Sequence, residues 1–195
     1  CRLKRVAADH KGDITPYLPR VPTEKNGKRV ALLGAGPASL AVARDLLPFG
    51  YEVHLFEKDP FGGGMMRTQI PAFRLPAVVL EEEVDLILGM GVECHFGHEV
   101  TSMKDMLDMG FDAYFVGTGA PRGRDLDLPG RQEVDDHISI GIDWLSSVAF
   151  GHTTSIEGKV IVMGGGNTAM DCCRTARRLG AESVTVVVRS AFEVM

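Results

Sequence analysis

The fold is determined by residues 29–39, which read RVALLGAGPAS. The continuous apolar run over residues 29–33 is typical of a strand that is buried on both faces of a parallel sheet. The glycines that follow break the strand, and Pro37 can occupy the first turn of a helix, since that position needs no backbone N–H. A second strand, at residues 51–56, is expected after that helix. The sequence therefore predicts a β-α-β unit whose parallel strands are joined by a right-handed crossover.

The glycine turn fits the pattern G-x-G-x-x-G except at its last position, where Ser39 stands. Gly34 suits the tight turn and Gly36 lets a pyrophosphate approach the backbone, while the helix N-terminus offers free N–H groups. Serine is small enough for the third position, which packs the helix against the strand. Glu57 lies 23 residues after Gly34, where a carboxylate can accept hydrogen bonds from ribose hydroxyls. We therefore expect dinucleotide binding; the alternative is a glycine turn kept for packing, with Glu57 a solvated strand end.

The same pattern returns near the end of the chain. Residues 159–163 and 183–188 read as strands around a helix at residues 167–179, and the turn is Gly164-Gly165-Gly166. Here the second strand ends in Arg189-Ser190 in place of an acid. An arginine beside the adenosine ribose can hold a 2′-phosphate by charge-assisted hydrogen bonds, so we expect NADP(H) in preference to NAD(H). The alternative is an Arg189 that only faces solvent. Two loops with opposite charge signatures indicate two different nucleotides.

Composition excludes several classes of function. The net charge of −5 favours neither nucleic acid nor an anionic membrane as a partner. No apolar run approaches the roughly 18 residues of a membrane span, and no apolar core of a signal peptide follows the basic first residues. The cysteines form neither a CxxC pair nor a zinc-site spacing, which indicates reduced thiols and a cytoplasmic location. They are Cys1, Cys94, Cys172 and Cys173.

The rest of the chain alternates further helices and strands. We expect helices at residues 77–90, from a cap at Thr101 to residue 109, and at 137–150, and strands at 92–96 and 113–116. Residues 1–28 read as a short helix followed by an extended arm. Residues 120–136 are polar and punctuated by proline and glycine, which is typical of a connection between domains.

Several motifs occur in a characteristic order along the chain. They are the turn at 34–39, Phe56-Glu57-Lys58, GGGMMR at 62–67, IPAFRLP at 70–76, FDAYFVGTGA at 111–120 and GGGNTAMD at 164–171. Together they resemble the glutamate synthase small-subunit family. That family includes the flavin module of dihydropyrimidine dehydrogenase and the large subunits of NADH-dependent ferredoxin:NADP oxidoreductases. The resemblance runs from about residue 28 to the end of the chain.

The resemblance implies an α/β protein with two Rossmann-like dinucleotide-binding domains, the NADP domain being inserted in the FAD domain. Residues 1–27 would be an arm that follows an iron–sulfur segment. Residues 28–125 would form the first part of the FAD-binding domain, and residues 126–195 an incomplete NAD(P)-binding domain. We therefore expect a fragment of a larger polypeptide or complex, truncated at its C-terminus.

The resemblance also implies the residues that bind each cofactor. The FAD pyrophosphate would be lined by Gly34, Gly36, Pro37, Ala38 and Ser39, and the ribose by Glu57 and Lys58. Gly64, Met65 and Arg67 would approach the flavin side, and Val100 would contact the adenine. Thr118 and Gly119 would contact FAD where the chain passes the cofactor a second time. The NADP pyrophosphate would be held by Gly165, Gly166, Asn167 and Thr168, and the 2′-phosphate by Arg189 and Ser190.

The implied activity is electron transfer between NADP(H) and an iron–sulfur domain or subunit through FAD. Hydride transfer to a flavin needs no general base, so no catalytic side chain is predicted. The resemblance makes Cys1 the last ligand of a 4Fe-4S cluster whose other cysteines lie upstream; the alternative is a lone surface thiol. Two other functions stay open. One is a nucleotide-binding scaffold in a redox complex, and the other is a disulfide reductase, against which the missing CxxC pair argues.

Overall fold

The computed structural model describes residues 2–125 and 129–191. It contains a four-stranded parallel sheet in the order β3-β2-β1-β4 and a separate parallel pair, β5-β6. The strands are β1 (Arg29–Leu33), β2 (Glu52–Glu57), β3 (Glu93–Phe96), β4 (Ala113–Val116), β5 (Lys159–Met163) and β6 (Ser183–Val187). The α-helices are α1 (Arg2–Asp9), α2 (Pro37–Leu46), α3 (Met65–Thr68), α4 (Ala77–Leu88), α5 (Met103–Asp108), α6 (Gly141–Ala149) and α7 (Asn167–Arg178). The predicted α/β fold with two β-α-β units is confirmed.

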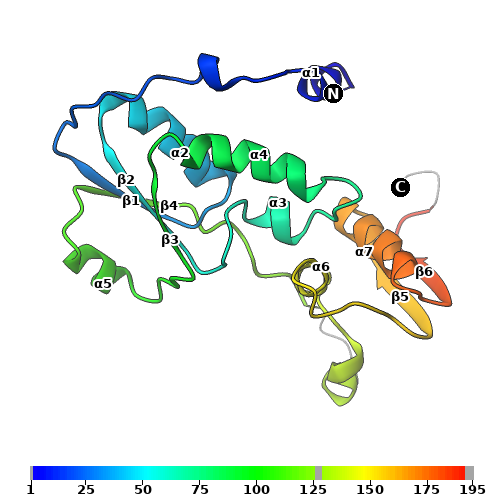
Figure 1. Ribbon diagram of the computed structural model, residues 1–195. Helices are drawn as coiled ribbons and strands as arrows, with labels where there is room; N and C mark the ends of the chain where they lie inside the picture. Colours follow the sequence, from blue (N-terminus) through cyan, green and yellow to red (C-terminus); the bar gives the residue numbers. More distant parts are fainter. Residues whose placement is uncertain (1, 126–128, 192–195) are drawn as a thin grey trace.

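Helices cover the four-stranded sheet on both faces (Figure 1). On one face α2 and α4 bury the apolar side chains that alternate along β1 and β2. That core is made of Val30, Leu32, Ala35, Leu40, Ala43, Leu47, Val53, Leu55, Leu80 and Val84. The opposite face is closed by the segment around α5 through a smaller cluster of Ala31, Leu33, Phe56, Met106 and Phe111. Burial on both faces explains why β1 reads as an unbroken apolar run.

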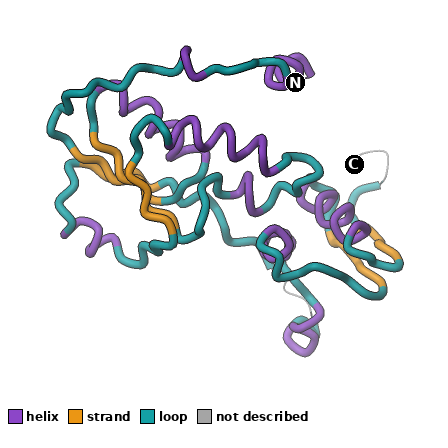
Figure 2. Tube along the Cα trace, in the orientation of Figure 1, coloured by secondary structure: helices purple, strands orange, loops and turns teal. Residues whose placement is uncertain are grey.

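The β5-β6 pair stands apart from the larger sheet, as the two groups of strands in Figure 2 show. Helix α7 packs against both strands, and α6 packs against α7. The other face of the pair carries apolar side chains that remain exposed, namely Ile161, Met163 and Val187. This second unit therefore has one covered and one open sheet face.

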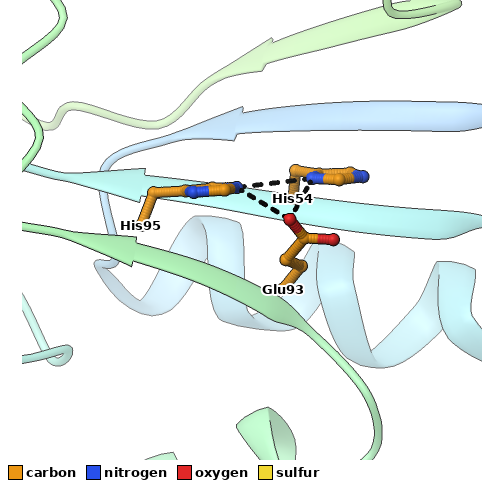
Figure 3. Close-up of side chains that lie close together, drawn as sticks. All are labelled: His54, Glu93 and His95. Atoms are coloured by element: carbon orange, nitrogen blue, oxygen red, sulfur yellow. Dashed lines mark hydrogen bonds and ion pairs between the residues drawn. The ribbon is translucent and has the colours of Figure 1, made fainter.

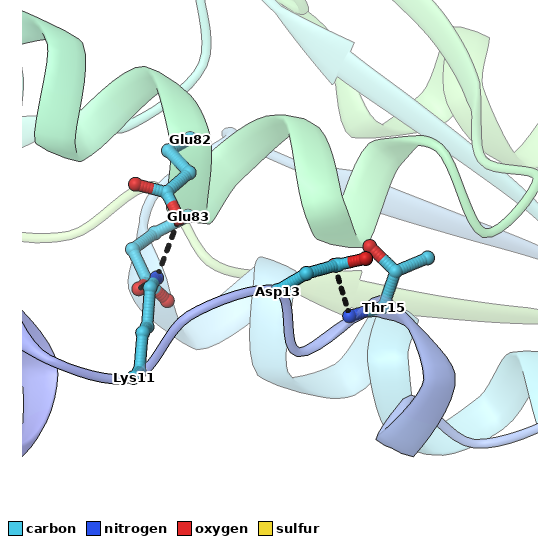
Figure 4. Close-up of polar contacts among 5 residues, drawn as sticks. All are labelled: Lys11, Asp13, Thr15, Glu82 and Glu83. Atoms are coloured by element: carbon cyan, nitrogen blue, oxygen red, sulfur yellow. Dashed lines mark hydrogen bonds and ion pairs between the residues drawn. The ribbon is translucent and has the colours of Figure 1, made fainter.

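The N-terminal arm runs along the first unit and is held by polar contacts (Figure 4). Lys11 Nζ lies 2.9 Å from Glu82 Oε1 and also pairs with Glu83, both on α4. The Asp13 carboxylate accepts a hydrogen bond of 2.9 Å from the backbone N–H of Thr15. The predicted short helix and extended arm are confirmed, since only α1 and the 3₁₀ turn Thr15–Tyr17 interrupt the arm's extended course.

Some predicted boundaries are wrong. Ser102, not Thr101, caps α5, and its hydroxyl accepts from the backbone N–H of Asp105 at 3.3 Å. The helix expected at 137–150 begins only at Gly141, because the preceding residues form a 3₁₀ segment at Gln132–His137 and then extend. The GGGMMR motif includes the single turn of α3. Helix α2 ends before Pro48, because proline removes a backbone donor there.

Candidate functional site

A glycine-rich loop connects β1 to the N-terminus of α2. Gly34 has φ +89°, and its N–H donates to the carbonyl of Phe56 at 2.8 Å, which joins the loop to β2. Gly36 is the N-cap of α2 and has an extended backbone and no side-chain cap. A Cβ added to Gly36 would meet its nearest neighbour only at 4.0 Å. The space beside Gly36 is therefore open, as the close approach of a pyrophosphate to the backbone requires.

Glu57 joins the two loops that follow β1 and β2. Its carboxylate is buried, and it accepts hydrogen bonds from the backbone N–H of Ala35 at 2.7 Å and of Asp59 at 3.0 Å. Burial, together with the charge of Glu57, raises the pKa of Asp59. A carboxylate has about four acceptor positions, so two remain for ribose hydroxyls. Lys58, the other residue expected at the ribose, is exposed beside it.

Ser39 packs the helix against the end of β4. Its side chain is fully buried, and its hydroxyl has no partner among the described residues. A Cβ added to Gly117 would fall 2.2 Å from Ser39 Oγ, so glycine at 117 is required by this close approach. The expected packing role is confirmed. Contact of Ser39 with the pyrophosphate stays a prediction, as it does for the exposed Pro37 and Ala38.

The segment after β2 returns to the glycine loop. Gly63 N–H donates to the carbonyl of Ala35 at 2.9 Å. Gly64, with φ +53°, lies so close that an added Cβ would be 2.9 Å from Gly36 Cα. Met65 is 41% exposed next to it, while Arg67 donates to the carbonyl of Gly62 at 2.8 Å. The structure thus brings Gly64 to the first loop but ties Arg67 to its own segment.

The residues that follow β4 pack against the first glycine loop. A Cβ on Gly34 would lie 2.8 Å from the carbonyl oxygen of Gly117 and 3.1 Å from Thr118 Cα. Thr118 and Gly119 are exposed beyond that contact. Val100 packs against the α5-side core, and its contact with the adenine stays a prediction. Four separate segments of the first unit therefore meet at one edge of the sheet, where open α/β sheets bind their ligands.

The second glycine loop repeats the first in backbone geometry. Gly164 N–H donates to the carbonyl of Val187 at 2.8 Å, the same length as the bond from Gly34. Gly166 caps α7 with φ −81° and ψ 174°, and Gly36 caps α2 with φ −77° and ψ 176°. An added Cβ on Gly166 would meet nothing within 4 Å. The residues expected around the second pyrophosphate are all exposed; they are Gly165, Gly166, Asn167 and Thr168.

Strand register shifts the expected arginine by one position. Met163 pairs with Val187, as Leu33 pairs with Phe56, so Val188 is the counterpart of Glu57. Arg189 is therefore the counterpart of Lys58, and it and Ser190 are exposed. No acid stands at the ribose position of the second unit. The neutral Val188 stands at that position, and the exposed Arg189 follows it.

Two contacts join the first unit to α7. Arg74 Nη1 lies 2.5 Å from Asp171 Oδ2, and the Asp171 side chain is only 7% exposed. Asp171 raises the pKa of Arg74 through their hydrogen bond. Arg178 sits over the ring of Phe73 at 3.8 Å. Arg74 and Phe73 both belong to the IPAFRLP motif, but no local pattern predicts contacts between that motif and α7.

A cavity of about 390 Å³ lies between these parts. Its walls are mainly apolar and come from residues 61–80 on one side and from α6 and α7 on the other. They include Met66, Ile70, Phe73, Leu145, Phe150 and Leu179. No glycine of either loop lines the cavity, although Arg67, which is expected on the flavin side, does.

The described cysteines offer no redox pair. Cys94, Cys172 and Cys173 are all free thiols. Cys172 Sγ donates to the carbonyl of Gly141 at 3.6 Å, and burial raises the pKa of its thiol to about 11. Such a thiol is a poor nucleophile at neutral pH. Cys1, the expected cluster ligand, lies outside the described residues.

Comparisons with known proteins agree with this geometry. The family model of pyridine nucleotide-disulphide oxidoreductases matches residues 28–193. The chain is 37% identical over 199 residues to the NADPH-Fe(3+) oxidoreductase subunit beta of Geobacter sulfurreducens, covering 99% of the chain and 30% of that protein. It is also 37% identical to the glutamate synthase [NADPH] small chain of Azospirillum brasilense, with 88% and 38% covered. The chain thus spans well under half the length of these relatives.

A solved structure shares the fold. Mycobacterium tuberculosis FprA in complex with NADPH matches with a TM-score of 0.66 and 18% identity, over 84% of this chain and 44% of that one. Within the described residues, no helix combines the length and apolar character that a membrane span needs. The resemblance to the glutamate synthase small-subunit family is confirmed, and FAD and NADP(H) are the cofactors that go with that family. The chain belongs to the pyridine nucleotide-disulphide oxidoreductase family.

Proposed function

We propose that this chain forms the FAD-binding and NADP(H)-binding part of an oxidoreductase that passes electrons between NADP(H) and an iron–sulfur partner. One observation carries the proposal. The two glycine loops share their backbone geometry, yet the position after the second strand holds the buried Glu57 in one unit and the neutral Val188 in the other. Two loops of the same backbone geometry suit two pyrophosphates. The different charge at the ribose position suits two nucleotides that differ at the ribose.

The first unit binds and orients FAD through its backbone. FAD, when bound, takes up two electrons with a hydride and releases them singly. The open N-terminus of α2 binds the pyrophosphate through its N–H groups, with Gly36 allowing close approach. Glu57 holds the loop and presents its remaining acceptor positions to the ribose. Gly64, pressed against Gly36, leads the chain from the pyrophosphate toward the flavin side.

The second unit selects the pyridine nucleotide. The N-terminus of α7 binds the NADP(H) pyrophosphate in the same manner as α2. Val188 leaves the ribose position without the negative charge that would repel a 2′-phosphate, and Arg189 supplies the cation that holds it. Ser190 offers a hydroxyl donor beside it.

The electron partner is proposed from the chain's own first helix and from its relatives. Helix α1 carries three cations directly after Cys1, namely Arg2, Lys4 and Arg5, and positive charge stabilises an anionic cluster. We place Cys1 as a ligand of a 4Fe-4S cluster completed by residues outside this chain. The relatives named above are each one component of an assembly by their names, a subunit beta and a small chain. Free cysteines agree with a cytoplasmic setting.

The test uses two glycine variants of the native protein. Gly36→Ala and Gly166→Ala place a methyl group in open space at backbone angles that alanine adopts freely, so both variants should fold normally. Gly36→Ala should lose FAD, measured by acid release and chromatography of the flavin. Gly166→Ala should keep FAD but respond weakly to NADPH, measured as anaerobic bleaching of the flavin absorbance. A wild-type protein with FMN alone or with no flavin would overturn the proposal, as would two variants that behave like the wild type.

A further inference from the structure

A group of metal-binding side chains lies on the sheet away from both glycine loops. His54 on β2 and Glu93 and His95 on β3 project from the same face and converge (Figure 3). Their common face follows from the strand register, in which His54 pairs with Glu93 and Phe56 pairs with His95. His54 lies three residues before Glu57, about 10 Å along the strand. The group is therefore distinct from the proposed FAD site.

The three donor atoms form a nearly equilateral triangle. His54 Nδ1 is 3.4 Å from His95 Nε2 and 3.4 Å from Glu93 Oε1, and His95 Nε2 is 3.5 Å from Glu93 Oε1. These separations are long for hydrogen bonds, which are commonest near 2.9–3.0 Å. Ligand atoms about 2.0–2.1 Å from a tetrahedral ion stand about 3.3–3.4 Å apart. The triangle thus fits one face of a zinc tetrahedron better than it fits a hydrogen-bonded trio.

Aromatic packing holds the two imidazoles in place. The His95 ring stacks on Phe56 with centroids 4.4 Å apart and an interplanar angle of 13°. The His54 ring meets the edge of Phe111 at 4.9 Å. The two imidazole planes differ by only 5°. Their nitrogens are therefore presented by a packed surface and not by free side chains, which lowers the ordering cost of binding.

The charge and exposure of the group suit a divalent cation. The Glu93 side chain is 63% exposed, whereas the His54 side chain is 10% exposed. An ion can therefore reach Glu93 from solvent and bind the buried His54 ring from that side. Two imidazoles and one carboxylate are a donor set that zinc accepts, with a fourth position left for water.

We propose that His54, Glu93 and His95 bind one divalent transition-metal ion of the zinc class. The ion fastens the edge strand β3 to β2 on the face that α5 partly covers. None of the three metal-binding residues belongs to a glycine loop. The ion therefore stabilises the sheet and takes no part in the redox chemistry.

The test is metal binding by the native protein, with Zn²⁺ and Co²⁺ as probes. Glu93→Gln and His95→Gln remove one ligand each at exposed or half-buried positions, so the fold should survive. Matched controls are Glu99→Gln and His10→Gln, both at exposed positions. After metal removal and dialysis against Zn²⁺, the wild type and controls should retain about one ion per chain. They should also give the visible bands of four-coordinate Co²⁺.

Each ligand variant should bind Zn²⁺ about tenfold or more weakly than the wild type. Zn²⁺ should raise the thermal midpoint of the wild type and the controls but not of the two ligand variants. No retained metal in the wild type would overturn the site. Full retention in either ligand variant, or equal loss in the controls, would overturn it as well. His54→Gln, checked for folding by circular dichroism, should match the other two ligand variants.

Discussion

Glu57 Oε2 lies 2.7 Å from the backbone nitrogen of Ala35, so a buried carboxylate at the end of β2 holds the glycine loop that follows β1. The residue expected to recognise a ribose therefore also shapes the first glycine loop. Its loss should therefore affect both folding and cofactor binding.

Glu57→Gln should lower FAD affinity about tenfold to a hundredfold and reduce stability by about 1–3 kcal/mol. The amide replaces an acceptor oxygen with a donor that faces a backbone N–H, which leaves buried groups unpaired. Flavin titration and denaturant unfolding measure the two effects. Glu24→Gln, at an exposed position, is the control. A stability loss without any loss of affinity would show that Glu57 only supports the loop.

Gly64→Ala should disrupt the first loop more than an alanine at a comparable glycine does. Gly64 has φ +53°, and an added Cβ would lie 2.9 Å from Gly36 Cα. Gly97 has φ +70° but nothing within 4 Å of an added Cβ. Gly97→Ala therefore measures the conformational strain alone, about 1–2 kcal/mol. Only Gly64→Ala should also weaken FAD binding, and equal flavin contents in the two variants would contradict this contact.

Arg189→Ala should weaken NADPH by about 1.5–3 kcal/mol, roughly tenfold to a hundredfold, and leave NADH almost unchanged. The lost interaction is the charge-assisted contact with the 2′-phosphate, which NADH lacks. Titration of both nucleotides against the wild type and the variant separates the two effects. Arg174→Ala, at an exposed position on α7, is the matched control. Similar losses for NADPH and NADH would mean that Arg189 does not discriminate between them.

Arg74→Gln should destabilise the protein by about 1–3 kcal/mol, because it leaves the buried Asp171 carboxylate without its cation. The pair is partly exposed on the arginine side, which keeps the loss below that of a fully buried pair. Combining this change with Asp171→Asn should cost less than the sum of the two single changes. Denaturant unfolding of the four proteins gives the coupling. Additive losses would show that the contact contributes no stability.

Alkaline pH should destabilise the protein through Cys172, whose thiol pKa is raised from 9.0 to about 11 by burial. Below pH 9 both folded and unfolded states keep the proton. As the pH rises toward 11, the unfolded thiol ionises first, so stability falls by about 2–3 kcal/mol across that window. Cys172→Ala should remove this part of the pH dependence, and Cys173→Ala should not. Unfolding free energies measured from pH 8 to 11 check the difference.

Much of the fold could be predicted because its signals are local. The apolar runs of β1 and β2, the turns at Gly34 and Gly164, and the prolines at 37 and 48 act within a few residues, so pattern and backbone preference suffice. Cap positions were less certain, since Ser102 and Thr101 differ by one residue and either hydroxyl could have begun α5. The match between Arg189 and Lys58 also required the register of β6, which no local pattern reports.

The sequence alone was enough to predict the two glycine loops, the acid that follows only the first, and the family, because each glycine loop and its following strand are contiguous in the chain. Tertiary structure decided which distant groups meet. His54 and His95 are 41 residues apart, and Arg74 and Asp171 are 97 apart. Their contacts depend on strand pairing and on how α7 packs, which arise from the whole core and not from any segment. The same holds for Ser39 and Gly117. Only the assembled sheet shows that residue 117 must be glycine, because a Cβ there would collide with the Ser39 side chain.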